Sequence, residues 1–166
     1  MPTNFLEELA AEWYEYKGYF IRRNVLVGKR PAGGHECELD VVGFHPETRH
    51  LVHIEASMDA AKWEERERRF HKKLGAGITY IPGLFPGLLR GEEPIEQIAL
   101  LVFSPKTGGQ TLGGGKVLHD SDLLRQIVDH FAGFRMIKKQ APEQFPVLRA
   151  IQFTTEYRRE LFNERT

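Results

Sequence analysis

The chain has 166 residues, enough for one domain over residues 1–166 that buries a core without disulfides or structural metals. Its one cysteine, Cys37, excludes an internal disulfide and indicates a reducing, cytoplasmic environment. Lysine plus arginine and aspartate plus glutamate balance at 23 each, so no global positive charge announces a nucleic-acid partner, and no apolar run predicts a membrane span or a secretory signal.

The N-terminal segment predicts a helix that ends before Gly18. Asn4 and Glu7 have the spacing of a capping box, and a glycine is the usual residue just after a helix. Four apolar residues recur at helical spacing and predict the buried face: Phe5, Leu9, Trp13 and Tyr16. Glu12 flanks this face, and Glu8 lies one step further round the helix.

Residues 19–27 predict a strand, and residues 36–44 and 50–57 predict a β-hairpin around a turn at 45–49. Apolar and polar residues alternate along both hairpin strands, as in half-buried strands. With the turn centred on residues 47 and 48, opposed positions sum to 95, which places Asp40 opposite Glu55. Like charges side by side destabilise a sheet, and a hard divalent cation held by carboxylate oxygens is the simplest compensation. The pair therefore suggests a magnesium site.

The rest of the chain predicts an alternation of helices and strands. The continuous apolar run at 98–103 is typical of a strand buried on both faces, which indicates an α/β fold with helices on both sides of the sheet. The other expected elements are a helix over 59–74 stopped by the glycines at 75 and 77, a loop over 78–97 with a short strand at 78–81, a flexible loop over 107–115, a short strand at 116–118, and helices over 121–131 and 142–163.

The chain has a helix with a glutamate, then Gly33-Gly34 before Glu38-Leu39-Asp40-Val41-Val42, and then the later segment Val52-His53-Ile54-Glu55-Ala56-Ser57. The order of these elements resembles the PD-(D/E)xK nuclease superfamily. Within it, the chain is most similar to Holliday-junction resolvases and Mrr-type restriction endonucleases, over about residues 4–104. The resemblance implies a restriction-endonuclease-like αβββαβ core, with a mixed central sheet flanked by helices. It also implies Mg²⁺- or Mn²⁺-dependent hydrolysis of DNA phosphodiesters, and a homodimer by analogy.

Carried over by position, the resemblance assigns Asp40 and Glu55 as metal ligands, with the Ala56 carbonyl as a further ligand. Glu8 matches the helical glutamate of the family, and Glu12 is its rival. These acids and the cation they hold would carry the hydrolysis, because the family uses no nucleophilic side chain.

Ser57 stands where the family has a catalytic lysine that orients the attacking water. A serine can form a hydrogen bond but carries no charge, so a basic residue elsewhere must supply the positive charge. Lys62, Lys72 and Lys73 on the following helix are the candidates, since the lysine has migrated in some members of the family. If none of them reaches the site, the alternative is an inactive nuclease fold that binds nucleic acid or a protein partner.

Other residues near the hairpin allow further interpretations. His53 shares the acidic face, where it would position a water or act as an extra ligand, and Glu38 would support the metal or pair with a basic residue. The histidines and the cysteine have no spacing that predicts a tetrahedral zinc site. The purely structural alternative is that each acid pairs with an arginine of the preceding strand, Arg22 or Arg23.

Overall fold

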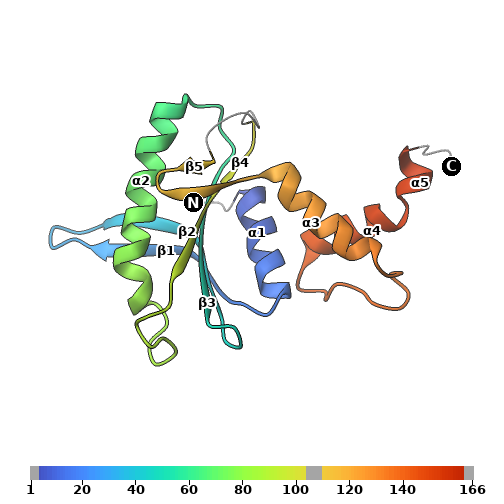
Figure 1. Cartoon of the computed structure of the whole chain (residues 1–166), viewed down its shortest axis with the longest axis horizontal. Coiled ribbons are helices and arrows are strands. Elements are labelled where there is room, and N and C mark those ends of the chain that lie inside the picture. Colours follow the sequence, from blue (N-terminus) through green and yellow to red (C-terminus); the bar gives the residue numbers. More distant parts are fainter. Residues whose placement is uncertain (1–3, 104–109, 163–166) are drawn as a thin grey trace. The chain divides into compact units, whose positions relative to one another are not determined.

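The computed structural model describes residues 4–103 and 110–162. The chain divides into two compact units, Met1–Asp120 and Ser121–Thr166. The hairpin with the two acids and all the elements that surround it belong to the first unit (Figure 1).

Within the described part of the first unit, six strands form one mixed sheet in the order β1-β2-β3-β4-β6-β5. The strands are β1 (Phe20–Lys29), β2 (His35–His45), β3 (His50–Ser57), β4 (Ile95–Leu101), β5 (Thr111–Leu112) and β6 (Gly115–His119). β1, β2 and β3 pair antiparallel, whereas β3, β4 and β6 pair parallel. Helix α1 (Phe5–Tyr16) and helix α2 (Trp63–Tyr80) lie on opposite faces of this sheet (Figure 1), so the predicted α/β class is confirmed.

The register of the β2–β3 hairpin is the predicted one. Val41 pairs with Ile54 and Val42 with His53, so paired positions sum to 95. The last pair of this ladder is Val41 with Ile54, and Asp40 and Glu55 are the next residues of the two strands. They are joined by a hydrogen bond from the Asp40 amide to the Glu55 carboxylate. Hydrophobic alternation and the position of the turn were sufficient to set this register, because a shift of one residue would turn every side chain to the other face.

Helix α1 begins as predicted, with both hydrogen bonds of the capping box between Asn4 and Glu7, and Gly18 follows it with a φ of 97°. Leu9 and Trp13 of its predicted buried face are buried, which confirms that part of the prediction, but the start of the face differs. Leu6 is buried, whereas Phe5 is 55% exposed. Fully buried Glu12 also lies on the inner side, so the helix places an acid where the periodicity predicted only an edge.

The predicted end of α2 near residue 74 is wrong, because the helix continues to Tyr80 and then passes into a short 3₁₀ helix at Ile81–Gly83. A short strand at 78–81 is therefore also wrong. Glycines weaken a helix only by about 1 kcal/mol each, and here the tertiary structure uses one of them. A side chain at Gly77 would collide with the ring of His53, so this glycine lets the helix pack closely on the sheet.

The buried strand predicted at 98–103 is present as β4, shifted toward the N-terminus, and Ala99, Leu100 and Leu101 are fully inaccessible. The expected loop at 107–115 contains a short hairpin instead, with β5 paired to β6. Gly113, with a φ of 59°, turns this hairpin against the backbone of α2 and donates a hydrogen bond to Glu67. Residues 107–109 of the predicted loop lie outside the described residues.

The second unit begins at Ser121, one residue into α3 (Asp120–Ala132), and contains α4 (Pro146–Glu156) and α5 (Arg158–Phe162). The helix predicted over 142–163 is shorter and interrupted at Tyr157, and Asn163 lies outside the described residues. Buried Gln152 ties the unit together, since it accepts from the Ala141 amide and donates to the Lys139 carbonyl. Among the described helices, none is both long and apolar enough to cross a membrane.

Candidate active site

The two acids of the hairpin hold the end of the β2–β3 ladder with their own carboxylates. The Ala56 amide donates to Oδ2 of Asp40 over 2.9 Å, and the Asp40 amide donates to Oε1 of Glu55 over 3.2 Å. Asp40 is 6% exposed and Glu55 is 1% exposed. Two carboxylates this deeply buried need a positive charge nearby, because an unpaired charge is costly away from water.

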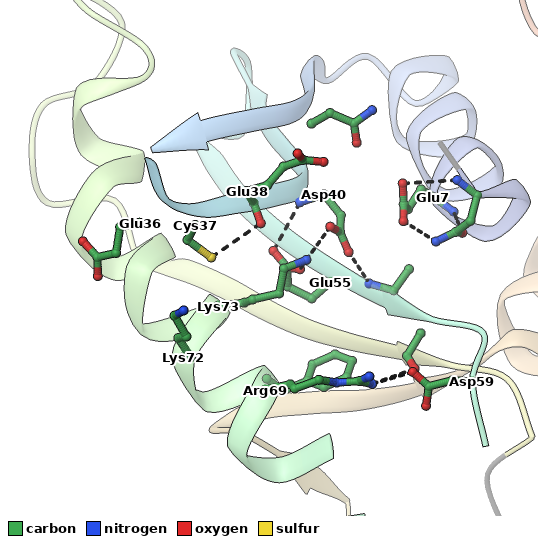
Figure 2. A pocket seen from close by; sticks show the side chains of 15 residues that line it. Glu7, Glu36, Cys37, Glu38, Asp40, Glu55, Asp59, Arg69, Lys72 and Lys73 are labelled. Atoms are coloured by element: carbon green, nitrogen blue, oxygen red, sulfur yellow. Dashed lines mark hydrogen bonds and ion pairs between the residues drawn. The ribbon is translucent and has the colours of Figure 1, made fainter. Parts of the chain in front are cut away.

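Lys73 of α2 supplies that charge (Figure 2). Its Nζ lies 2.5 Å from Oδ1 of Asp40 and also forms an ion pair with Oε2 of Glu55. Of the three lysines proposed from the sequence, Lys73 is the one that contacts the acids. Lys72 lines the same cavity without an ion pair to either acid, and Lys62 is the exposed residue that precedes the first turn of α2.

The three groups shift one another's ionisation. Burial, reinforced by the charge of Glu55, raises the pKa of Asp40 to about 7 despite the opposing effect of Lys73. Burial by itself would raise the pKa of Glu55. The hydrogen bond from His53 and the charge of Lys73 have the larger combined effect, so the pKa of Glu55 is lowered. The pKa of Lys73 is raised, because the two carboxylates outweigh the effect of its burial. Carboxylates with pKa values pushed apart in one cavity are typical of functional sites.

Ser57, at the position where the resemblance predicts a lysine, is the last residue of β3 and is 5% exposed. Its hydroxyl oxygen lies 3.3 Å from Nη2 of Arg69, which also binds Asp59 over 2.6 Å. Arg69 and Lys73 are four residues apart on α2 and therefore share one face of the helix. The same face of α2 thus brings a second cation to the cavity, paired with Asp59 and not with the two acids, and the sequence had not singled out Arg69.

The acids of α1 divide between the cavity and other partners. Glu8 lies 3.8 Å from Arg23 and does not line the cavity; nor does Glu12, which is fully buried. Glu7 does line it, and burial raises its pKa. The sequence identified Glu7 only as a capping residue, because a helical wheel cannot tell which turn of a helix faces the end of a strand.

A cavity of about 530 Å³ opens over the acid pair, between the start of α1, β2, the end of β3 and the middle of α2. Its charged lining residues are Glu7, Glu36, Glu38, Asp40, Glu55, Asp59, Arg69, Lys72 and Lys73. Acids outnumber bases in this lining, so the cavity attracts cations. A phosphodiester would enter it more easily together with a divalent cation.

The structural alternative from the sequence, that Arg22 or Arg23 neutralises the acids, does not match the contacts. Arg22 donates to the Leu84 carbonyl, and Arg23 pairs with Glu8 and Glu15. Within residues 4–103 and 110–162, no three histidine, cysteine, aspartate or glutamate side chains gather as a ready-made metal cage. Any metal here would have the two carboxylates as its side-chain ligands, with the remaining ligands from backbone carbonyl, water or substrate, a mode that suits Mg²⁺.

His53, the third polar residue of this face, does not line the cavity. Its ring is fully buried, and its Nε2 lies 2.7 Å from Oε1 of Glu55 on the side away from Lys73.

Comparison of the chain with protein-family models, with curated proteins and with solved structures found no match.

Proposed function

We propose that this chain is a metal-dependent nuclease of the PD-(D/E)xK type that hydrolyses phosphodiester bonds in DNA. The observation that supports it is the meeting of Lys73 with Asp40 and Glu55 in one cavity. An acid, a second acid and a lysine are the side chains that the resemblance requires, and α2 supplies the lysine that Ser57 does not. The chain order α1, β1, β2, β3, α2, β4 also agrees with an αβββαβ core.

The acid pair fits a divalent cation. Oδ1 of Asp40 and Oε2 of Glu55 both point at one positive centre, the ammonium of Lys73, which stands in for a metal between them. Asp40 and Glu55 would hold Mg²⁺ or Mn²⁺, with the Ala56 carbonyl as the further ligand that the resemblance implies. A bound cation would lower the pKa of a water and offset charge on the phosphate.

The side chains of the chain itself perform the remaining tasks. Lys73 is partly exposed to the cavity, with 31% of its side chain accessible, so its ammonium would reach a phosphate oxygen there and stabilise the charge that develops on it. Arg69, held beside Ser57 by Asp59, offers a second cation to the phosphate. Their positive charge also lessens the repulsion between an anionic substrate and the acidic lining.

One observation favours the inactive alternative, a nuclease fold that only binds nucleic acid or a protein. The ammonium of Lys73 already pairs with both carboxylates, so each of them has a counter-charge without a metal. The two functions differ in what happens when Mn²⁺ is offered. A nuclease exchanges the ammonium for the metal, whereas an inactive fold keeps its ion pairs.

The experiment combines calorimetric titration with Mn²⁺ and cleavage of nicked, branched and single-stranded DNA in Mg²⁺. We expect wild-type protein to bind Mn²⁺ and cleave at least one substrate, and Asp40→Asn to lose both properties. Lys72→Met, which removes a neighbouring charge of the same cavity, is the matched control and should keep both. Cleavage that is equal in wild type and Asp40→Asn would mean contamination, and absence of Mn²⁺ binding by wild type would refute the proposal.

A further inference from the structure

A histidine ring with no exposed surface lies directly behind the acid pair. His53 of β3 is 0% exposed, and its two ring nitrogens face two different polar partners. Nε2 lies 2.7 Å from Oε1 of Glu55, and Nδ1 lies 3.3 Å from Nε2 of Gln97. A buried imidazole with a partner at each nitrogen has a fixed orientation.

Gln97 determines which nitrogen of His53 carries the proton. The Gln97 amide nitrogen donates to the Leu74 carbonyl over 2.7 Å, and this bond fixes the orientation of the amide. The group that faces Nδ1 is therefore an NH₂ donor, so Nδ1 accepts. The ring proton is then on Nε2, and Nε2 donates to Glu55.

Gly77 of α2 holds the ring in place from the other side. A Cβ atom at this position would lie 2.2 Å from Nδ1 and 2.4 Å from Cε1 of His53. The helix backbone therefore closes over the ring without room for a methyl group. The ring cannot move away from Glu55 unless α2 also moves.

The consequence for Glu55 is a difference between its two oxygens. Oε1 accepts from Nε2 of His53 and from the amide of Asp40, over 2.7 Å and 3.2 Å. Oε2 is left to face Lys73. Two donors on one oxygen fix the rotation of the carboxylate, which would otherwise be free to turn.

We infer that His53 is a positioning residue, whose Nε2–H group holds Glu55 with Oε2 directed to the metal-binding side of the cavity. This inference rests on the proposed function, because it assigns the direction of a metal-binding oxygen. It gives His53 no contact with substrate and no exchange of protons. Loss of a residue that forms a hydrogen bond to a metal ligand commonly weakens metal binding by about 10–100-fold.

The test compares two amides at position 53. Glutamine places an amide nitrogen near the location of Nε2 and keeps the donor to Glu55, whereas asparagine reaches only to the location of Nδ1. We expect His53→Gln to bind Mn²⁺ nearly as well as wild type, and His53→Asn to bind about 10-fold or more weakly in calorimetric titration. His50→Gln changes a histidine of the same strand that contacts Tyr19 and Glu96, so it should leave the affinity unchanged.

A second readout needs no metal. Nitrogen-15 NMR of the metal-free protein should show the His53 ring protonated at Nε2 and not at Nδ1. Gly77→Ala supplies a further variant should His53→Asn not fold, and it should weaken Mn²⁺ binding because its methyl group displaces the ring.

The outcomes separate this inference from the proposed function. Tight Mn²⁺ binding by wild type and equally tight binding by His53→Asn, or a proton on Nδ1, would overturn the positioning role alone. Failure of wild type to bind Mn²⁺ would overturn the proposed function and the positioning role together.

Discussion

The ammonium of Lys73 lies 2.5 Å from Oδ1 of Asp40, although the two residues are 33 positions apart in the chain. The contact joins the middle of β2 to the middle of α2, and the ammonium also forms an ion pair with Glu55. In the resemblance that the sequence suggested, the lysine follows the second acid by two residues. Here it comes from the next helix, and the charge arrives at the acids from across the cavity.

Replacement of this lysine tests its two roles at once. Lys73→Met should lower cleavage by about 100-fold or more, because a preorganised cation for the phosphate is lost. It should also lower the free energy of unfolding by about 1–3 kcal/mol, since two buried carboxylates lose their counter-charge. Urea unfolding and initial cleavage rates at pH 7.5 measure the two effects. Lys72→Met is the control, and equal effects of both substitutions would contradict a special role for Lys73.

The raised pKa of Asp40 predicts a stability that falls as pH rises. Because that pKa is about 7 in the folded protein and about 4 in an unfolded chain, the folded state binds more protons between these values. Stability from this group is therefore greatest at low pH and is lost as pH rises to 7. The lowered pKa of Glu55 acts in the opposite direction, but only below about pH 4.5, where unfolded glutamates titrate.

The measurement is urea unfolding of wild type and Asp40→Asn at several pH values between 5 and 8. Asparagine cannot titrate, so wild type should lose about 2–4 kcal/mol relative to the variant across this range. Both proteins share their histidines, whose own titration cancels in the difference. A difference that does not change with pH would contradict the raised pKa.

Replacement of two glycines of α2 by alanine should change the stability of the protein in opposite directions. Gly77→Ala should destabilise the protein by about 1–3 kcal/mol, because the added methyl group collides with His53 and overpacks the interior. Gly75→Ala should stabilise it by about 0.5–1 kcal/mol, because no atom lies within 4 Å of the added carbon and alanine favours a helix. Thermal unfolding of both variants decides this. Stabilisation by both would mean that the close contact with His53 does not exist.

Glu7 is the acid of α1 that lines the cavity, so its charge is expected to contribute to metal binding. Glutamine also suits the third position of a capping box, so Glu7→Gln should keep the helix intact and remove only the charge. Loss of that charge should weaken Mn²⁺ binding about 2–5-fold, in line with a modest long-range interaction. Glu8→Gln, whose carboxylate faces Arg23, should bind Mn²⁺ like wild type. A larger effect of Glu8→Gln would restore the assignment made from the sequence.

Local rules succeeded where one segment determines its own structure. The capping box at Asn4 required only neighbouring residues, and the hairpin register required only alternation and a turn. The same rules failed for the end of α2, where glycine propensity predicted a stop and packing against His53 carried the helix on to Tyr80. The start of the buried face of α1 was also misjudged, because Phe5 and Leu6 are neighbours and only the sheet decides which one is covered.

Strand pairing around a known turn was enough to predict that Asp40 and Glu55 lie next to each other, because one register buries the apolar side chains. Three contacts could not be predicted this way: which lysine meets the two acids, which acid of α1 lines the cavity, and that His53 donates to Glu55 from behind. The contacts of Lys73 and His53 depend on how far α2 extends and where it crosses the sheet, and the place of Glu7 depends on where α1 lies on the sheet. That placement is set by packing over the whole unit, and no single stretch of the chain encodes it.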